Sequence, residues 1–159
     1  MRCHLRTRRL AWWPVAALIT AMPVAVSADV QINRLTDMAF GALPTSGADQ
    51  TQTESVCAAS GLLGGLYSVT ATGSGNGGIF TLANGSAALP YEVQWSSTAG
   101  QSAGTNLTAG SALTGLTAAL LNCATGPNAS LIVVIRGAQI VKATAGSYSG
   151  TLTIILSAN

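Results

Sequence analysis

Short apolar runs separated by clusters of Gly, Asn, Ser and Pro recur along most of this chain. In many of these runs apolar and polar residues alternate, and a period of two is typical of a β-strand with one buried face. After residue 28 the sequence offers no helical segment with credible caps. The pattern therefore predicts an all-β fold. The expected strands cover residues 30–40, 51–58, 67–72, 79–82, 88–95, 112–116, 131–135 and 148–156.

Two of these strands carry more specific patterns. Residues 131–135 are apolar without interruption, which predicts a strand buried on both faces. In the first strand, 30–40, Val30, Ile32, Met38 and Phe40 share one parity, and Leu35 breaks it. An off-parity residue of this kind predicts a bend or a β-bulge.

The aromatic residues of the expected strand 88–95 leave a choice. Tyr91, Val93 and Trp95 lie on one face of that strand. Such a face either fills the core or presents flat aromatic rings to a sugar. We expect core filling, and a sugar-binding surface is the alternative.

The first 28 residues are organised as a secretory signal peptide. Four arginines precede an apolar run over 11–26, and residues 26–28 suit signal peptidase. The run contains Pro14 and Pro23 and is shorter than a spanning helix requires, so we expect cleavage rather than a retained membrane anchor. The mature chain would then be 29–159, a size that suits one domain with a single core.

Removal of the signal changes the charge and the available chemistry. The mature chain holds three basic and five acidic residues, a net charge of −2, and so lacks the basic footprint of a nucleic-acid-binding protein. It has no histidine, because His4 leaves with the signal. Its acids are dispersed and its cysteines are far apart, so no metal-ligand spacing is present. We expect no cofactor, metal or nucleic-acid partner.

Some short motifs are shared with enzymes. Residues 100–104 match the G-x-S-x-G pattern around a nucleophilic serine, Ser102, but the chain has no histidine to serve as its base. Lys142 lacks a Ser-x-x-Lys partner. The glycine-rich segment 73–78 is followed by no helix that would face a phosphate. We therefore expect surface loops and a hairpin turn, and no enzyme activity.

Cys57 and Cys123 are the two cysteines that remain after cleavage. In an oxidising compartment we expect them to form one disulfide, and two free buried thiols are the alternative. In the chain-entropy model, a bond that closes a 66-residue separation stabilises the fold by ~4 kcal/mol.

Three segments carry a family resemblance. Residues 145–154 read AGSYSGTLTI, residues 35–41 read LTDMAFG and residues 89–95 read LPYEVQW. The first resembles the terminal A-G-x-Y-x-D-x-[VL]-x-[VI] signature of spore coat protein U-like domains, which build archaic chaperone-usher pili. The other two are similar to that family's early L-x-F-G and central Y-x-[LV]-[YW] strands. Gly150 departs from the usual aspartate, and the cysteine usual in the first strand is missing.

The resemblance implies an immunoglobulin-like β-sandwich of six to seven strands that is incomplete and is completed by a donor strand from a partner. Physically this is β-augmentation of an open sheet edge. The implied partners are a periplasmic pilus chaperone, an outer-membrane usher and other pilin subunits. The implied location is the surface fimbrium, reached through the periplasm, where the fibre contacts a host or abiotic surface ligand. We expect the acceptor groove to be lined by Met38, Phe40, Leu152, Ile154 and Leu156.

The N-terminal side of the mature chain bears on the kind of subunit. Polymerising subunits of the family carry a donor extension ahead of the first strand, whereas here only residues 29–34 precede the 35–41 motif. Val30 and Ile32 alternate suitably but form a short donor segment. We therefore expect a terminal, tip or accessory subunit rather than a major shaft pilin. The alternative function is a self-contained secreted lectin-like adhesive sandwich.

Overall fold

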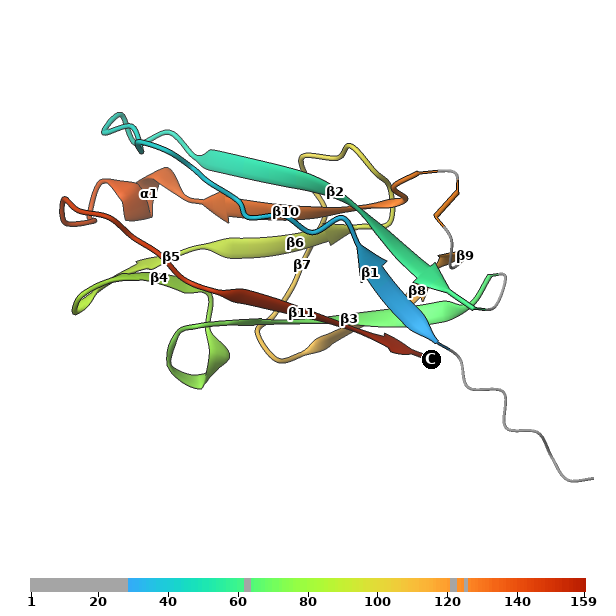
Figure 1. Ribbon diagram of the computed structural model, residues 1–159. Helices are drawn as coiled ribbons and strands as arrows, with labels where there is room; N and C mark the ends of the chain where they lie inside the picture. The colour runs from blue at the N-terminus through green and yellow to red at the C-terminus, as the bar shows by residue number, and fades with distance from the viewer. Residues whose placement is uncertain (1–28, 62–63, 121–122, 125) are drawn as a thin grey trace, which may run out of the picture.

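The computed structural model describes residues 29–61, 64–120, 123–124 and 126–159, and these form two packed β-sheets (Figure 1). The expected signal peptide, residues 1–28, lies outside the described residues. The prediction of an all-β sandwich is confirmed. Within the described residues, no helix is long and apolar enough to cross a membrane.

The two sheets differ in size, and a small hairpin lies beside them. The larger sheet has the order β1-β2-β10-β6-β7, with β9 parallel to the end of β2, and the smaller has the order β11-β3-β8. The larger sheet comprises β1 (Val30–Asn33), β2 (Gln50–Ser60), β10 (Ala129–Ile135), β6 (Glu92–Ser96), β7 (Thr105–Asn106) and β9 (Ala119–Leu120). The smaller sheet comprises β11 (Leu152–Ala158), β3 (Leu66–Gly73) and β8 (Ala112–Thr117). The hairpin is β4 (Thr81–Asn84) and β5 (Ala87–Pro90).

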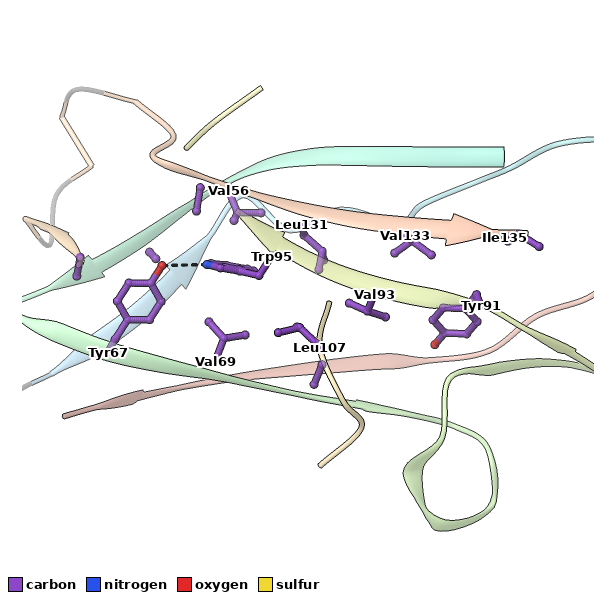
Figure 2. Packing of buried hydrophobic residues seen from close by; sticks show 14 of the residues in the cluster. Val56, Tyr67, Val69, Tyr91, Val93, Trp95, Leu107, Leu131, Val133 and Ile135 are labelled. Carbon is purple, nitrogen blue, oxygen red and sulfur yellow. Dashed lines mark hydrogen bonds between the residues drawn. The ribbon is translucent and has the colours of Figure 1, made fainter. Parts of the chain in front are cut away.

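The core fills the space between the two sheets (Figure 2). All seven residues of β10 are buried, which confirms the prediction of a strand covered on both faces. Tyr91, Val93 and Trp95 are also buried, so this aromatic face fills the core and is not a sugar-binding surface. The expectation of core filling is confirmed.

A disulfide links the larger sheet to the loop that precedes β10. Cys57 of β2 is fully buried and is bonded to Cys123, with their Cα atoms 6.3 Å apart. Nearby, the Asn128 side chain accepts a hydrogen bond from the Ala58 amide and donates one to the Ala58 carbonyl. These contacts fix the chain where it enters β10.

The expected strands agree with the structure to within two residues at each end, except for three. The first ends at Asn33 instead of residue 40, because Arg34 adopts a left-handed conformation with φ 71°. The expected strand 88–95 is two strands, because Pro90 has no N–H to donate and the chain leaves β4 for β10 there. The last strand begins at Leu152 instead of residue 148, since residues 149 and 151 bond to β4 and to Ser74.

The expectation of no helix was wrong in one place. A single helical turn, α1 (Gly137–Ile140), follows β10, and a short 3-10 turn, η1 (Asn76–Gly78), lies in the expected glycine-rich turn. A Cβ on Gly137 would lie 1.8 Å from the Gly47 carbonyl oxygen. Glycine is therefore required where the loop before β2 crosses the start of α1.

Candidate binding groove

An open groove of about 1250 Å³ runs along one side of the sandwich, between β11 and segment 35–45. Its floor is made by core side chains of the larger sheet: Leu131, Val133 and Ile135 of β10, together with Tyr91. Ile140 of α1 closes part of the floor. The floor is apolar and its side chains are buried, from 0% exposed at Ile135 to 8% at Ile140, so the apolar surface that the groove presents to water belongs mainly to its walls.

The two walls come from opposite ends of the described chain. Leu152 and Ile154 of β11 form one wall, and Met38, Phe40 and Leu43 of segment 35–45 line the other. All five are half-buried and pack against the core. The structure therefore brings together four of the residues expected from the sequence, which are Met38, Phe40, Leu152 and Ile154.

Leu156, the fifth expected residue, is not part of the groove lining. It packs against the core on the same face of β11 but lies nearer the end of that strand, where β1 contacts β11. In Figure 1 β1 and the C-terminus meet at this end. The groove therefore has one end that β1 covers.

Val30 and Ile32, the candidate donor residues, lie in β1. There they pair with Ser60 and Ala58 of the same chain's β2 and pack against the core. Donation to another subunit would require β1 to leave this position. A donor role for these two residues stays a prediction.

Within the described residues, the groove-side edge of β11 has no partner strand. The Asn159 amide donates to the Leu66 carbonyl, so Asn159 and Leu66 form a hydrogen-bonded pair of the β11–β3 ladder. Such pairs alternate along an antiparallel ladder, which places Thr153, Ile155 and Ser157 in hydrogen-bonded pairs with β3. The intervening residues therefore point their N–H and C=O groups away from β3, towards the groove.

The opposite wall also has unpaired backbone. Residues 37–43 belong to no strand and include Gly41 in a left-handed conformation, and their N–H and C=O groups form no hydrogen bond within the described residues. The preceding residue, Thr36, donates from its amide to Glu54 Oε1 over 2.7 Å and also donates from its hydroxyl to that oxygen. Unpaired backbone on both sides of an apolar groove is the setting in which an added strand pairs.

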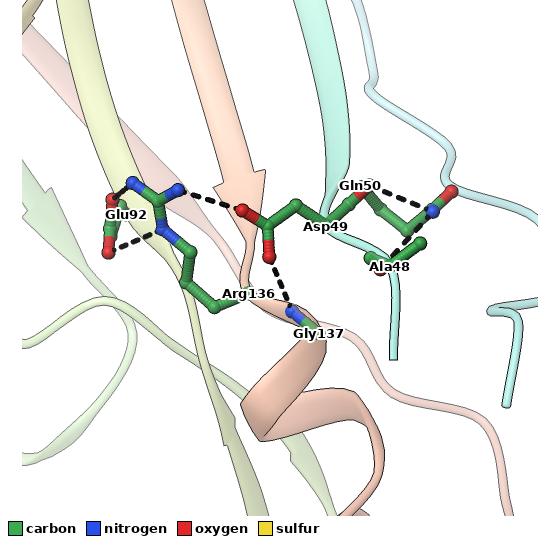
Figure 3. Close-up of polar contacts among 6 residues, drawn as sticks. All are labelled: Ala48, Asp49, Gln50, Glu92, Arg136 and Gly137. Atoms are coloured by element: carbon green, nitrogen blue, oxygen red, sulfur yellow. Dashed lines mark hydrogen bonds and ion pairs between the residues drawn. The ribbon is translucent and has the colours of Figure 1, made fainter. Parts of the chain in front are cut away.

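Charged residues gather at the α1 end of the sheet, outside the groove (Figure 3). Arg136 donates from Nε to Glu92 over 2.9 Å and from a terminal nitrogen to Asp49 over 2.8 Å. The second oxygen of Asp49 accepts from the Gly137 amide over 2.8 Å. This cluster ties the start of β2 and of β6 to the end of β10.

The same contacts shift the pKa values of the two acids and of Arg136. The hydrogen bond from the Gly137 amide, followed by that from Arg136, lowers the pKa of Asp49. The hydrogen bond from Arg136 lowers the pKa of Glu92, and both acids raise the pKa of Arg136. All three side chains are partly exposed, so the cluster acts on stability and offers no buried acid for catalysis.

Neither Ser102 nor Lys142, the residues of the enzyme-like motifs, lines the groove. Ser102 and Lys142 are exposed. Within the described residues, no three side chains from His, Cys, Asp and Glu gather as a metal site would need. The absence of enzyme activity stays a prediction.

Gly150, which departs from the family signature, lines the groove where the chain passes β4. A Cβ there would lie 3.0 Å from the Thr81 carbonyl oxygen and 2.9 Å from Ser74 Oγ. An aspartate would crowd this approach. The departure therefore fits the local packing of this chain.

Sequence reasoning missed most of the groove floor. Leu131, Val133 and Ile135 were expected to be buried, but a run that is apolar on every residue does not indicate which side chains face an opening. Tyr148, which also lines the groove, has its hydroxyl bonded to Thr144. The C-terminal motif that contains Tyr148 was the signal that could have located this part of the site.

Comparisons with known proteins add little to this geometry. No family model matches the chain, and no curated protein matches it. One similar solved structure is a chain from a chaperone–tip adhesin complex of CFA/I fimbriae biogenesis, with a TM-score of 0.49 and 18% identity over 82% of this chain. This chain spans only 43% of that one. The fold and groove define an all-β sandwich with an open strand edge, and membership of the spore coat protein U-like family stays a prediction.

Proposed function

We propose that this protein is a subunit of a bacterial surface fibre and that its groove accepts a β-strand from another polypeptide. The observation that carries the proposal is the apolar groove bordered by the free edge of β11 and by the unpaired backbone of residues 37–43. An added strand would satisfy backbone groups through main-chain hydrogen bonds, and its alternate side chains would cover the apolar floor. No catalytic step is part of this function.

An open groove of this kind is a hazard before assembly. An unpaired strand edge beside half-buried apolar side chains promotes aggregation. This supports a periplasmic chaperone as the first occupant and another subunit as the second, with an outer-membrane usher between the two steps. The Cys57–Cys123 bond supports passage through an oxidising compartment, since disulfides persist there.

The position of β1 supports an accepting role over a donating role. Val30 and Ile32 are engaged in their own chain, where they pair with β2. A subunit that accepts a strand but has no free strand to offer would occupy a terminal, tip or accessory place in the fibre. Attachment to a host or abiotic surface would then be its contribution to adhesion.

The test compares two neighbouring isoleucines of β11. Ile154 lines the groove, whereas Ile155 lies on the outer face of the sheet and is 52% exposed. Residues 29–159 would be produced in an oxidising periplasm with and without a pilus chaperone, as wild type, Ile154→Ser and Ile155→Ser. Complex formation would be followed by size-exclusion chromatography, and thermal unfolding would be recorded with and without a synthetic peptide that copies residues 29–41.

We expect wild type and Ile155→Ser to be recovered with the chaperone and to be stabilised by the peptide, and Ile154→Ser to lose both effects. A soluble monomer that unfolds cooperatively and responds to neither chaperone nor peptide would refute the proposal. That outcome would favour the self-contained lectin-like sandwich.

A further inference from the structure

The first strand stops where its backbone turns, although its partner strand continues. β1 pairs with β2 from Val30 opposite Ser60 to Asn33 opposite Cys57. Arg34 then takes a left-handed conformation, which is uncommon for a residue other than glycine. Beyond this point, the edge of β2 over 50–56 that faces away from β10 has no partner strand in the part of the chain that the structure describes.

The register of the existing ladder can be continued past the break. It would place Leu35 opposite Ser55, Asp37 opposite Thr53 and Ala39 opposite Thr51. The Gly61 amide donates to the Asp29 carbonyl, so odd-numbered residues of β1 form the hydrogen-bonded pairs with β2. The even-numbered residues would then point their backbone groups towards the groove.

Side-chain parity agrees with this continuation. Val30 and Ile32 of β1 and Met38 and Phe40 of the groove wall all pack against the core, and all four are even-numbered. In a continuous strand they would share the inward face. The alternation that predicted a strand over 30–40 is thus present, although the strand stops at Asn33.

Two features oppose backbone pairing between this segment and β2. The Glu54 carboxylate accepts both the amide and the hydroxyl of Thr36, while its second oxygen, Oε2, is buried without a hydrogen-bond partner. A continuous strand would also turn Arg34 to the inward face, which is costly for a charged side chain. Both features oppose closure of the ladder while the groove is open.

We propose that residues 35–40 and the free edge of β2 are the two halves of an interrupted β-ladder, and that the ladder closes when a strand occupies the groove. The idea that an occupant of the groove drives this closure rests on the proposed function. Closure would direct the backbone groups of Thr36, Met38 and Phe40 towards the groove, where a bound strand pairs with them. An occupant therefore gains a second row of hydrogen bonds that the open state does not offer.

The test is cysteine crosslinking across the expected register. Asp37 and Thr53 are both exposed and would face each other outward, so the double variant Asp37→Cys/Thr53→Cys reports closure. In a hydrogen-bonded pair the Cα atoms lie about 5.5 Å apart, which suits a disulfide. The control, Asp37→Cys/Thr51→Cys, is displaced by two residues. Each pair would be oxidised mildly with and without the peptide that copies residues 29–41.

Two substitutions at Arg34 shift the equilibrium without touching the groove. Arg34→Val disfavours the left-handed turn and suits the inward face, whereas Arg34→Gly favours the turn. We expect Arg34→Val to raise the rate of 37–53 crosslinking about tenfold in the free protein, because a β-branched residue tolerates the left-handed conformation less well than arginine does. The peptide should do the same in the wild-type background, and Arg34→Gly should oppose it.

The outcomes separate this proposal from the proposed function. If the peptide binds, as judged by thermal unfolding, and 37–53 crosslinking stays at the control rate in every background, the interrupted ladder is wrong and the accepting groove stands. If Arg34→Val crosslinks in register but the peptide does not bind, the ladder stands and the proposed function fails. Control-rate crosslinking without peptide binding would overturn both.

Discussion

Trp95 of β6 donates a hydrogen bond from its indole Nε1 to the hydroxyl of Tyr67 on β3, over 3.1 Å, and so joins the two sheets inside the core (Figure 2). The two rings meet edge to face, with centroids 6.3 Å apart and planes inclined by 77°. Both residues are fully buried or nearly so. A polar contact in such a place fixes how one sheet lies on the other, because an unmade hydrogen bond there has no water to replace it.

Removing the hydroxyl should therefore cost more at Tyr67 than at Tyr91. Tyr67→Phe leaves the buried indole N–H without an acceptor, and we expect a loss of about 1–3 kcal/mol in the free energy of unfolding. Tyr91 lines the groove and its hydroxyl forms no hydrogen bond within the described residues, so Tyr91→Phe should cost less. Urea unfolding of the two variants measures the difference, and equal costs would contradict it.

Acid should weaken the protein through the cluster around Arg136. The folded state lowers the pKa of Asp49, through the Gly137 amide, and of Glu92, through Arg136. An acid whose pKa is lower in the folded state stabilises that state above its unfolded pKa, and the stabilisation is lost as pH falls through the folded value. We expect the urea concentration at the unfolding midpoint to decrease as the pH is lowered below about 4, where unperturbed carboxyls titrate.

Arg136→Gln is the matched variant for this pH dependence. It removes the ion pairs while keeping a side chain of similar length, so it should lower the midpoint at pH 7 and flatten its fall in acid. Because the three side chains are partly exposed, added salt should reduce the difference from wild type. A wild-type midpoint with the same acid dependence as Arg136→Gln would argue against the cluster.

The disulfide should contribute mainly through the unfolded chain. Cys57 and Cys123 are 66 residues apart, and the chain-entropy model assigns such a bond ~4 kcal/mol. We expect Cys123→Ala, which leaves the buried Cys57 in place, to lose a comparable free energy of unfolding. Denaturation of wild type with and without a reductant, against Cys123→Ala, measures this. An unchanged midpoint on reduction would show that the bond carries no stability.

The sequence predicted the strands that depend on the local residue pattern and missed the features that depend on contacts between distant parts of the chain. The apolar run of β10 and the alternation of β3 and β6 were enough to place buried strands. Pro90 was visible in the sequence as a residue without an N–H, yet the change of sheet that it allows depends on which strands lie nearby. The left-handed turn at Arg34 has no signal in residue type, because glycine is the residue that usually marks such a turn.

The candidate groove was predictable to a similar degree. Its walls follow from strand parity and from the C-terminal motif, which identified Met38, Phe40, Leu152 and Ile154. The extent of the groove does not follow from these signals. The contact of β1 with β11, which leaves Leu156 outside the groove, is made by residues far apart in the chain. Parity shows which face of a strand is apolar, whereas topology decides how much of that face stays uncovered.

Because one edge of β11 is free, we expect amide hydrogen exchange to alternate between slow and fast along this strand. Thr153, Ile155 and Ser157 are expected to donate to β3, so their amides should exchange slowly in the free protein. The amides of Leu152 and Ile154 point to the open groove and should exchange much faster, although their side chains are the more buried ones. Residue-by-residue exchange followed by NMR would show this alternation along a single strand.

Occupation of the groove should then remove the alternation. A peptide paired with β11 accepts hydrogen bonds from Leu152 and Ile154, so their amides should become protected while those of Thr153 and Ile155 change little. A ligand that only covered the apolar floor would slow exchange along the whole strand without this selectivity. Exchange that is alternating in the free protein and uniform after binding is therefore the signature of an added strand, and alternation that persists under saturating peptide would show that the occupant does not pair with β11.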